Sequence, residues 1–189
     1  MRSHAPVRSC LLILSLLLTG CADPTPIILS AQYQPPAAGA DPAAHAPACR
    51  VKLGEITDKR SDTESMGSIS GRVVRAADST AWLRSGLESL GRDGGITLVK
   101  AGDPDLVLSA DLLKAYVMSV TTAKSANVVL SVHTSRRGVS APDQVYRGTD
   151  EGPNWIAGDD EAQGALNRAL SQALVQVRGD LLKQCAEGP

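Results

Sequence analysis

The chain has 189 residues, of which 19 are Lys or Arg and 20 are Asp or Glu, so its formal net charge at neutral pH is −1. A chain so close to neutral has no basic footprint for nucleic acid, and without any Phe it offers few aromatic platforms for stacking bases or sugars. Its length suits one domain whose core is built from Val, Leu, Ile and Ala.

Residues 1–20 have the pattern of a secretory signal. Two arginines precede an apolar run over residues 10–18 that is too short to cross a bilayer as a permanent helix. The tetrapeptide Leu-Thr-Gly-Cys at 18–21 then resembles the lipobox of bacterial lipoproteins, where the Cys thiol is diacylglycerylated and the freed amine is acylated. This resemblance implies that Cys21 becomes the lipidated N-terminus of the mature chain. An ordinary cleaved signal with an incidental Cys is the alternative.

Removal of the signal would leave 169 residues with 17 basic and 20 acidic side chains, a formal charge of −3. The mature chain is then expected to divide into three parts. The lipidated Cys and a Pro- and Ala-rich tether occupy 21–48, a folded domain occupies 49–185, and a short tail occupies 186–189. Six prolines and the lack of a helical or alternating period predict an extended tether. Residues 27–29 within it either pair as an edge strand or belong to a simple spacer.

Cys49 and Cys185 are left unassigned, because Cys10 leaves with the signal and Cys21 carries the lipid. Two remaining thiols in an oxidising compartment predict one disulfide. Cys49 directly precedes the first strand of the domain and Cys185 ends its last helix, positions that antiparallel packing can bring together. Metal binding is the alternative, but the three histidines lie far apart and none is spaced to complete a zinc set.

The first half of the domain is predicted as a strand, a polar loop and a helix. The strand begins near Cys49 and gives way to a polar loop over 58–67, after which 68–77 fits either a short strand or an irregular excursion. Asp78 or Ser79 is a suitable N-cap for a helix with leucines at i, i+4 and i+7. A pair of glycines supplies the stop of this helix.

The second half of the domain is predicted to contain mostly strands. Residues 96–99 form a short strand, and the apolar side chains of 105–120 change parity, which predicts a strand with a bulge near Leu112 and Leu113. Residues 127–134 alternate cleanly and predict an antiparallel hairpin with 105–120 across a polar turn over 121–126. A further strand is expected after this hairpin, over 144–148.

The last predicted element is a long helix that Asp159 and Asp160 open with negative charge, where a helix N-terminus favours it. Packing of its apolar stripe on the sheet is favoured over a coiled coil, because the stripe covers fewer than four heptads and is rich in Ala. The order of elements predicts an α+β fold, a mixed, mostly antiparallel sheet with two helices packed on one face. The other face is left to water or to a partner. The stripe consists of Leu166, Leu170, Ala173, Leu174, Val177 and Leu181.

Candidate catalytic residues are sparse. No Gly-rich phosphate loop leads a strand into a helix, and no Gly-x-Ser-x-Gly elbow occurs. His133 is the only histidine of the folded region, so a serine or cysteine nucleophile would depend on it, and an exposed strand histidine is the simpler interpretation. Asp58, Asp62 and Glu64 could bind a cation or act as paired carboxylates. Two basic residues lie among them, however, and favour a solvated, internally neutralised loop.

The order of these features resembles that of the YajG-type envelope lipoproteins. The resemblance covers about residues 49 to 184 and implies a small periplasmic α+β domain held on the outer membrane, with no recognised catalytic residues. It rests on the lipobox, the Pro-rich spacer, the strand ending in Asp58-Lys59-Arg60 with Gly67 soon after, the helix leading through Gly94-Gly95 to a strand, Tyr146-Arg147-Gly148, and the long terminal helix.

These features predict a noncatalytic lipoprotein on the periplasmic face of the outer membrane, anchored by acyl chains on Cys21 and needing no cofactor. Ala22, and not Asp, follows the lipidated Cys, which favours the outer membrane by the sorting rule of enteric bacteria. The expected partner is another envelope component, from transport, assembly or cell-wall machinery.

Two loops are the candidate contacts with this partner. Asp58 and Arg60 lie in one of them, and Trp155 lies in the other, where it either anchors a partner or covers the end of the core. The alternative function is a membrane-anchored hydrolase acting on cell-wall or lipid material. Such an enzyme would need a pocket that gathers Asp58, Asp62, Glu64 or His133.

Overall fold

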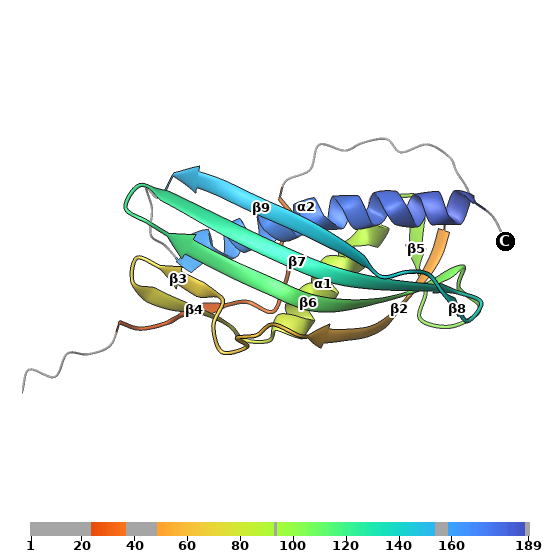
Figure 1. Ribbon diagram of the computed structural model, residues 1–189, viewed down its shortest axis with the longest axis horizontal. Coiled ribbons are helices and arrows are strands. Elements are labelled where there is room, and N and C mark those ends of the chain that lie inside the picture. Colours follow the sequence, from red (N-terminus) through yellow and green to blue (C-terminus); the bar gives the residue numbers. More distant parts are fainter. Residues whose placement is uncertain (1–23, 37–48, 93, 154–158, 188–189) are drawn as a thin grey trace, which may run out of the picture.

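The computed structural model describes residues 24–36, 49–92, 94–153 and 159–187 (Figure 1). The expected signal, the expected lipidation site Cys21 and the candidate contact Trp155 lie outside these ranges. Within the ranges, no helix combines the length and the apolar character that a membrane span requires.

The described chain forms nine strands, two α-helices and one 3₁₀ turn (Figure 1). In chain order these are β1 (Ile27–Leu29), β2 (Cys49–Asp58), β3 (Gly67–Ile69), β4 (Arg72–Ala76), α1 (Ser79–Glu88), the 3₁₀ turn (Ser89–Gly91), β5 (Ile96–Leu98), β6 (Leu106–Ser119), β7 (Ala123–Arg136), β8 (Val139–Ser140), β9 (Gln144–Pro153) and α2 (Asp159–Ala186).

The sheet is mixed, and most of its paired residues lie in antiparallel ladders. Strands β6 and β7 form a long antiparallel hairpin, and β9 pairs antiparallel with the other side of β7. Strand β2 pairs parallel with β6 and with β5, whereas the β3–β4 hairpin joins β6 through β3 and carries β1 on its outer edge. This arrangement confirms the predicted α+β class.

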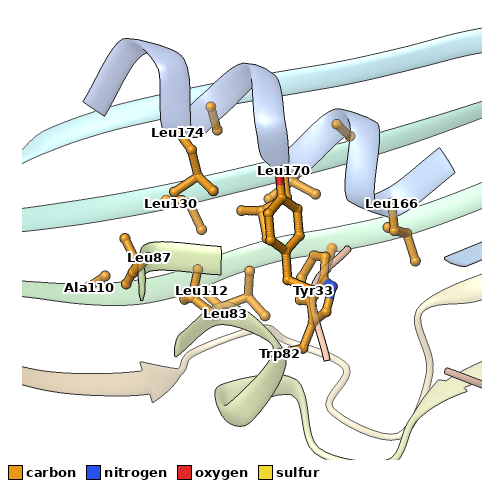
Figure 2. Close-up of a cluster of buried hydrophobic side chains, with 14 of the residues drawn as sticks. Tyr33, Trp82, Leu83, Leu87, Ala110, Leu112, Leu130, Leu166, Leu170 and Leu174 are labelled. Carbon is orange, nitrogen blue, oxygen red and sulfur yellow. The ribbon is translucent and has the colours of Figure 1, made fainter. Parts of the chain in front are cut away.

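Both helices pack on one face of the sheet and enclose the core between the two layers (Figure 1). Each fully buried leucine contributes about 1.5–3 kcal/mol relative to an exposed one. The buried indole of Trp82 on α1 donates a hydrogen bond of 2.9 Å to Asn167 on α2, which ties the helices together. Figure 2 shows side chains from both layers in contact, among them Leu83 and Leu87 of α1, Leu166, Leu170 and Leu174 of α2, and Ala110, Leu112 and Leu130 of the sheet.

Residues 24–36 pack along the domain and are not a free spacer. Ile27 pairs with Val74 in a parallel ladder, which confirms the edge strand that the sequence offered as one of two readings. The backbone N–H of Ser30 donates to Gln163 of α2 at 2.8 Å. Tyr33 is buried and lies against the core beside the helices (Figure 2). The N-terminal segment is therefore part of the folded domain.

Two predicted details of the sheet are decided by the structure. The ladder between β6 and β7 shifts register between Leu112 and Lys114, which confirms the bulge. The ambiguous region over 68–77 is the β3–β4 hairpin, whose central residues Ser70 and Gly71 both have positive φ, as a type I′ turn requires.

Two other predicted boundaries are wrong. The polar turn expected over 121–126 has only two residues. Residues 123–126 belong to β7, where they pair with β6 on one side and β9 on the other. The helix after Asp78 does not run to the paired glycines but ends at Glu88. The hydroxyl of Ser89 donates to the carbonyl of Gly86, and such a bond competes with the continuing helix.

A disulfide joins Cys49 at the start of β2 to Cys185 near the end of α2, with the Cα atoms 5.9 Å apart. The bridge closes a loop across 136 residues of sequence. In the chain-entropy model such a loop contributes up to about 4–5 kcal/mol. We expect the double variant C49A/C185A to lose stability on this scale in urea unfolding. Thiol titration of the unfolded, unreduced protein checks the bridge directly, and two free thiols from these positions would contradict it.

Candidate functional site

One face of the sheet is covered by the helices, and no described element covers the other, which we call the open face. Successive side chains of a strand point to opposite faces, so Asp111 points to the open face because Ala110 and Leu112 are in the core. At the position of Asp111, the ladders place four strands side by side. The residues in register there are Thr57 of β2, Asp111 of β6, Ser131 of β7 and Val145 of β9.

Five side chains on and beside this row form what we call the Asp111 cluster. The carboxylate of Asp111 accepts a hydrogen bond from the Lys59 ammonium at 2.8 Å, and its other oxygen accepts one from the Thr57 hydroxyl. The Nε2 atom of His133 lies 2.9 Å from Asp111, and its Nδ1 atom lies 2.6 Å from Asp143. Both ring nitrogens of His133 are thus engaged by carboxylates.

The electrostatics of this cluster favour the ionised forms of Asp111 and His133. Burial by itself raises the pKa of Asp111, but hydrogen bonds from Lys59, Thr57 and His133 outweigh it and lower this pKa to about 2. Hydrogen bonds to Asp143 and Asp111 raise the pKa of His133 above its ordinary value. Two carboxylates therefore face the His133 ring and the Lys59 ammonium. Because carboxylates engage both ring nitrogens of His133, neither nitrogen is presented to a nucleophile as a general base.

Removal of Asp143 is expected to weaken the structure in a pH-dependent manner. The raised pKa of His133 contributes stability that is complete below its unfolded-state pKa of about 6.5 and is lost as the pH rises through the folded value. The stability difference between wild type and Asp143→Asn should therefore be largest at mildly acidic pH and shrink in alkali. The pair is partly exposed, so we expect less than about 1 kcal/mol.

Titration of the His133 ring protons by NMR measures the shift directly. The pKa of His133 should fall in Asp143→Asn and stay unchanged in Glu151→Gln, which removes an exposed carboxylate elsewhere on β9. Equal His133 pKa values in wild type and Asp143→Asn would contradict the contact.

Arg60 was a candidate partner contact, and only 4% of its side chain is exposed in the structure. Its guanidinium pairs with both oxygens of Asp58, with Nη2 and Oδ2 separated by 2.7 Å, and it also donates to the carbonyl of Ser65 at 2.9 Å. Asp58 in turn accepts a 2.6 Å hydrogen bond from Ser79 at the start of α1. Asp58 and Arg60 thus fasten the loop after β2 to the helix layer, and their role as partner contacts stays a prediction.

The variant Arg60→Ala is expected to unfold more easily by about 3 kcal/mol, because it leaves a largely buried carboxylate without its charged partner. Lys59→Ala is the matched control. This neighbouring lysine is 59% exposed, and Asp111 keeps Thr57 and His133 as partners when the ammonium is lost, so the loss of stability should be much smaller than for Arg60→Ala. Urea unfolding of the two variants gives the comparison. Equal losses in both would contradict a structural role for Arg60.

The residues needed by the hydrolase alternative do not converge. Asp58 contacts the helix layer, whereas His133 lies on the opposite side of the sheet. The Oδ1 atom of Asp62 accepts hydrogen bonds from the backbone N–H groups of Glu64 and Ser65, so this carboxylate stabilises a turn of the loop. Among the residues that the structure describes, no group of three or more His, Cys, Asp or Glu side chains is placed to hold a metal ion.

Exposed apolar side chains continue from the Asp111 cluster along the open face of β6. Leu113 lies at the bulge, and Tyr116, Met118 and Val120 follow at every second position toward the end of the strand. The Lys114 ammonium lies 5.9 Å from the centre of the Tyr116 ring, within reach of a cation–π contact. The open face thus combines a charged region with an apolar strip.

Comparison with known proteins shows the fold of this chain but not its family. No protein-family model matches the sequence, and no curated protein matches it. A crystal structure of a Xanthomonas campestris protein, described under the family model DUF330, aligns with a TM-score of 0.61 at 13% identity, over 85% of this chain and 97% of that one. The two chains share a fold.

Other solved structures are more distant. A minor lipoprotein from Acinetobacter baumannii aligns with a TM-score of 0.45 at 10% identity, over 72% of this chain and 94% of that one. A hypothetical protein from Chlamydia trachomatis aligns at 0.49 with 11% identity, over 71% of this chain and 98% of that one. The structural neighbours thus include a protein described as a lipoprotein, and the resemblance to the YajG-type lipoproteins stays a prediction.

Proposed function

We propose that the protein is a lipid-anchored lipoprotein on the periplasmic face of the outer membrane, that it binds another envelope component, and that it is not an enzyme. The observation that carries this proposal is the open face. A sheet face that no described element covers presents an ionised cluster beside an apolar strip, a combination that suits recognition of a folded partner. The lipobox and the resemblance to YajG-type lipoproteins support the anchored, envelope part of the proposal.

The absence of catalysis in this proposal is supported by the state of His133. Both of its ring nitrogens contact carboxylates, and these contacts raise its pKa above the ordinary value. Two other acidic residues considered for catalysis, Asp58 and Asp62, serve the loop after β2, where their oxygens accept hydrogen bonds from the loop itself. These side chains therefore hold the structure of the domain.

Site-specific photocrosslinking in intact membranes tests the binding surface. Val145 lies on the open face and is 52% exposed, and Val175 on the outer side of α2 is 67% exposed and provides a matched control. A photoreactive residue at position 145 of the lipidated protein should capture one discrete envelope partner, and the same residue at 175 should not. Capture from position 175 alone would contradict the proposal. A measurable turnover of purified protein that His133→Ala removes would favour the hydrolase.

A further inference from the structure

The chain between the lipidated residue and the folded domain is very short. The domain begins with β1 at Ile27, and even before it the carbonyl of Thr25 accepts a 2.8 Å hydrogen bond from Arg72 of β4. Three residue steps separate Cys21 from Pro24, the first described residue. A fully extended chain spans at most about 3.6 Å per residue, so this connection reaches about 11 Å. Acyl chains on Cys21 would hold the start of the domain at the lipid surface.

Two hairpin turns lie at the same end of the molecule as this start (Figure 1). Arg72, which binds Thr25, directly follows the β3–β4 turn. The backbone N–H of Ser70 in that turn donates to the Ser119 hydroxyl at 2.8 Å, and Ser119 directly precedes the β6–β7 turn. A continuous chain of contacts therefore joins the start of the domain to both turns.

This end of the molecule exposes apolar side chains. Ser68 of β3 pairs with Val73 of β4 on one side and with Met118 of β6 on the other, which places these two exposed side chains in one row on the two strands that flank β3. Val120, 57% exposed, ends the apolar strip at the β6–β7 turn. Membrane contact by Met118 and Val120 leaves Leu113 and Tyr116, nearer the Asp111 cluster, for the proposed partner. Exposed apolar groups beside a lipid anchor gain by moving from water into the interfacial region of a bilayer.

We propose that the β3–β4 and β6–β7 turns form a membrane-facing end that rests on the phospholipid surface, with the long strands pointing away from it. The inference rests on the proposed lipidation of Cys21 and goes beyond it by giving the domain an orientation. Strand β7 has 14 residues and rises by about 3.3 Å per residue. The end of the domain that holds β8 therefore lies about 45 Å from the membrane-facing end. The open face would then stand along the membrane normal, within reach of a partner in the periplasm.

Two exposed valines at the two ends of the β6–β7 hairpin provide the test. Val120 lies at the membrane-facing end, and Val139, 74% exposed, lies in β8 at the other. Each is replaced by Cys in the lipidated protein and labelled with an environment-sensitive fluorophore. The introduced thiol is the reactive one, since Cys49 and Cys185 are bridged and Cys21 is acylated. The labelled proteins are reconstituted in phosphatidylethanolamine and phosphatidylglycerol vesicles that contain headgroup-spin-labelled lipid and no other protein.

Quenching by the spin-labelled lipid should be several-fold stronger at position 120 than at 139. A third label at position 73 should follow 120, because Val73 lies at the same end. If the protein floats with the vesicles but 120 and 139 are quenched equally, or neither is quenched, the orientation is wrong and the anchor stands. If the wild-type protein does not float with the vesicles, the anchor and the orientation fail together.

Discussion

Gly148→Ala should lower the free energy of unfolding by about 3 kcal/mol or more, because it would force the terminal helix away from the sheet. A Cβ atom at this position of β9 would overlap the carbonyl oxygen of Ala169 and lie 2.9 Å from the backbone nitrogen of Ala173. Both are backbone atoms of α2 and cannot rotate aside. Neighbouring hydrogen bonds, such as that from the Gln176 side chain to the Arg147 carbonyl at 2.7 Å, fix the helix at this distance.

Gly152→Ala is the control for this prediction. Gly152 lies four residues further along the same strand, so its side chain would point to the same face. There the nearest atom to a new Cβ is the flexible Cε of Lys124 at 3.7 Å, an ordinary contact. Urea unfolding should show a large loss for Gly148→Ala and a small change for Gly152→Ala. If the two variants are equally stable, the close approach of helix and strand is not a constraint.

Cys21→Ser is expected to abolish both acylation and membrane retention. One acyl chain holds a protein only marginally, whereas two or three, at about 0.8 kcal/mol per buried methylene, hold it in practice permanently. Removal of the thiol removes the attachment point of the diacylglyceryl group. Mass spectrometry of the mature protein and fractionation of membranes measure the two effects.

Cys10→Ser provides the control for the anchor, since Cys10 lies in the apolar run of the signal and should leave with it. This variant should be acylated and retained like wild type. A wild-type mature protein with no mass beyond that of the peptide would disprove the anchor, whatever the fractionation shows.

Long periodic elements were predictable from the sequence, whereas three of the short strands were left open between two readings. The terminal helix could be predicted because its apolar stripe recurs over many turns. The bulge could be predicted because the apolar side chains of one strand change from one face to the other along the sequence. Strands β1, β3 and β4 have three to five residues each, too few to establish a period. Their pairing is set by tertiary contacts, above all by the long β6, on which the hairpin docks through β3.

The candidate site was predicted less well than the fold, because the sequence of a charged loop does not show which residues form ion pairs with its charged side chains. Arg60 looked like a solvated loop residue, yet Asp58 two positions away and a loop carbonyl satisfy its guanidinium and bury it. Asp111 was missed, although a lone acidic residue within an apolar strand was a visible signal. Its partners Lys59 and His133 lie 52 and 22 residues away, and only the strand register brings them together.

The place of β1 at the edge of the sheet has a consequence for aggregation. Without residues 24–36, strand β4 would become an edge strand with unpaired backbone groups and with Val74 uncovered. Such an edge is a template for pairing with a second chain. Strand β1 is itself a poor template, because it is three residues long and Pro26, which lacks an N–H donor, directly precedes it. A fragment that begins at Cys49 would lose this protection and tend to self-associate through β4.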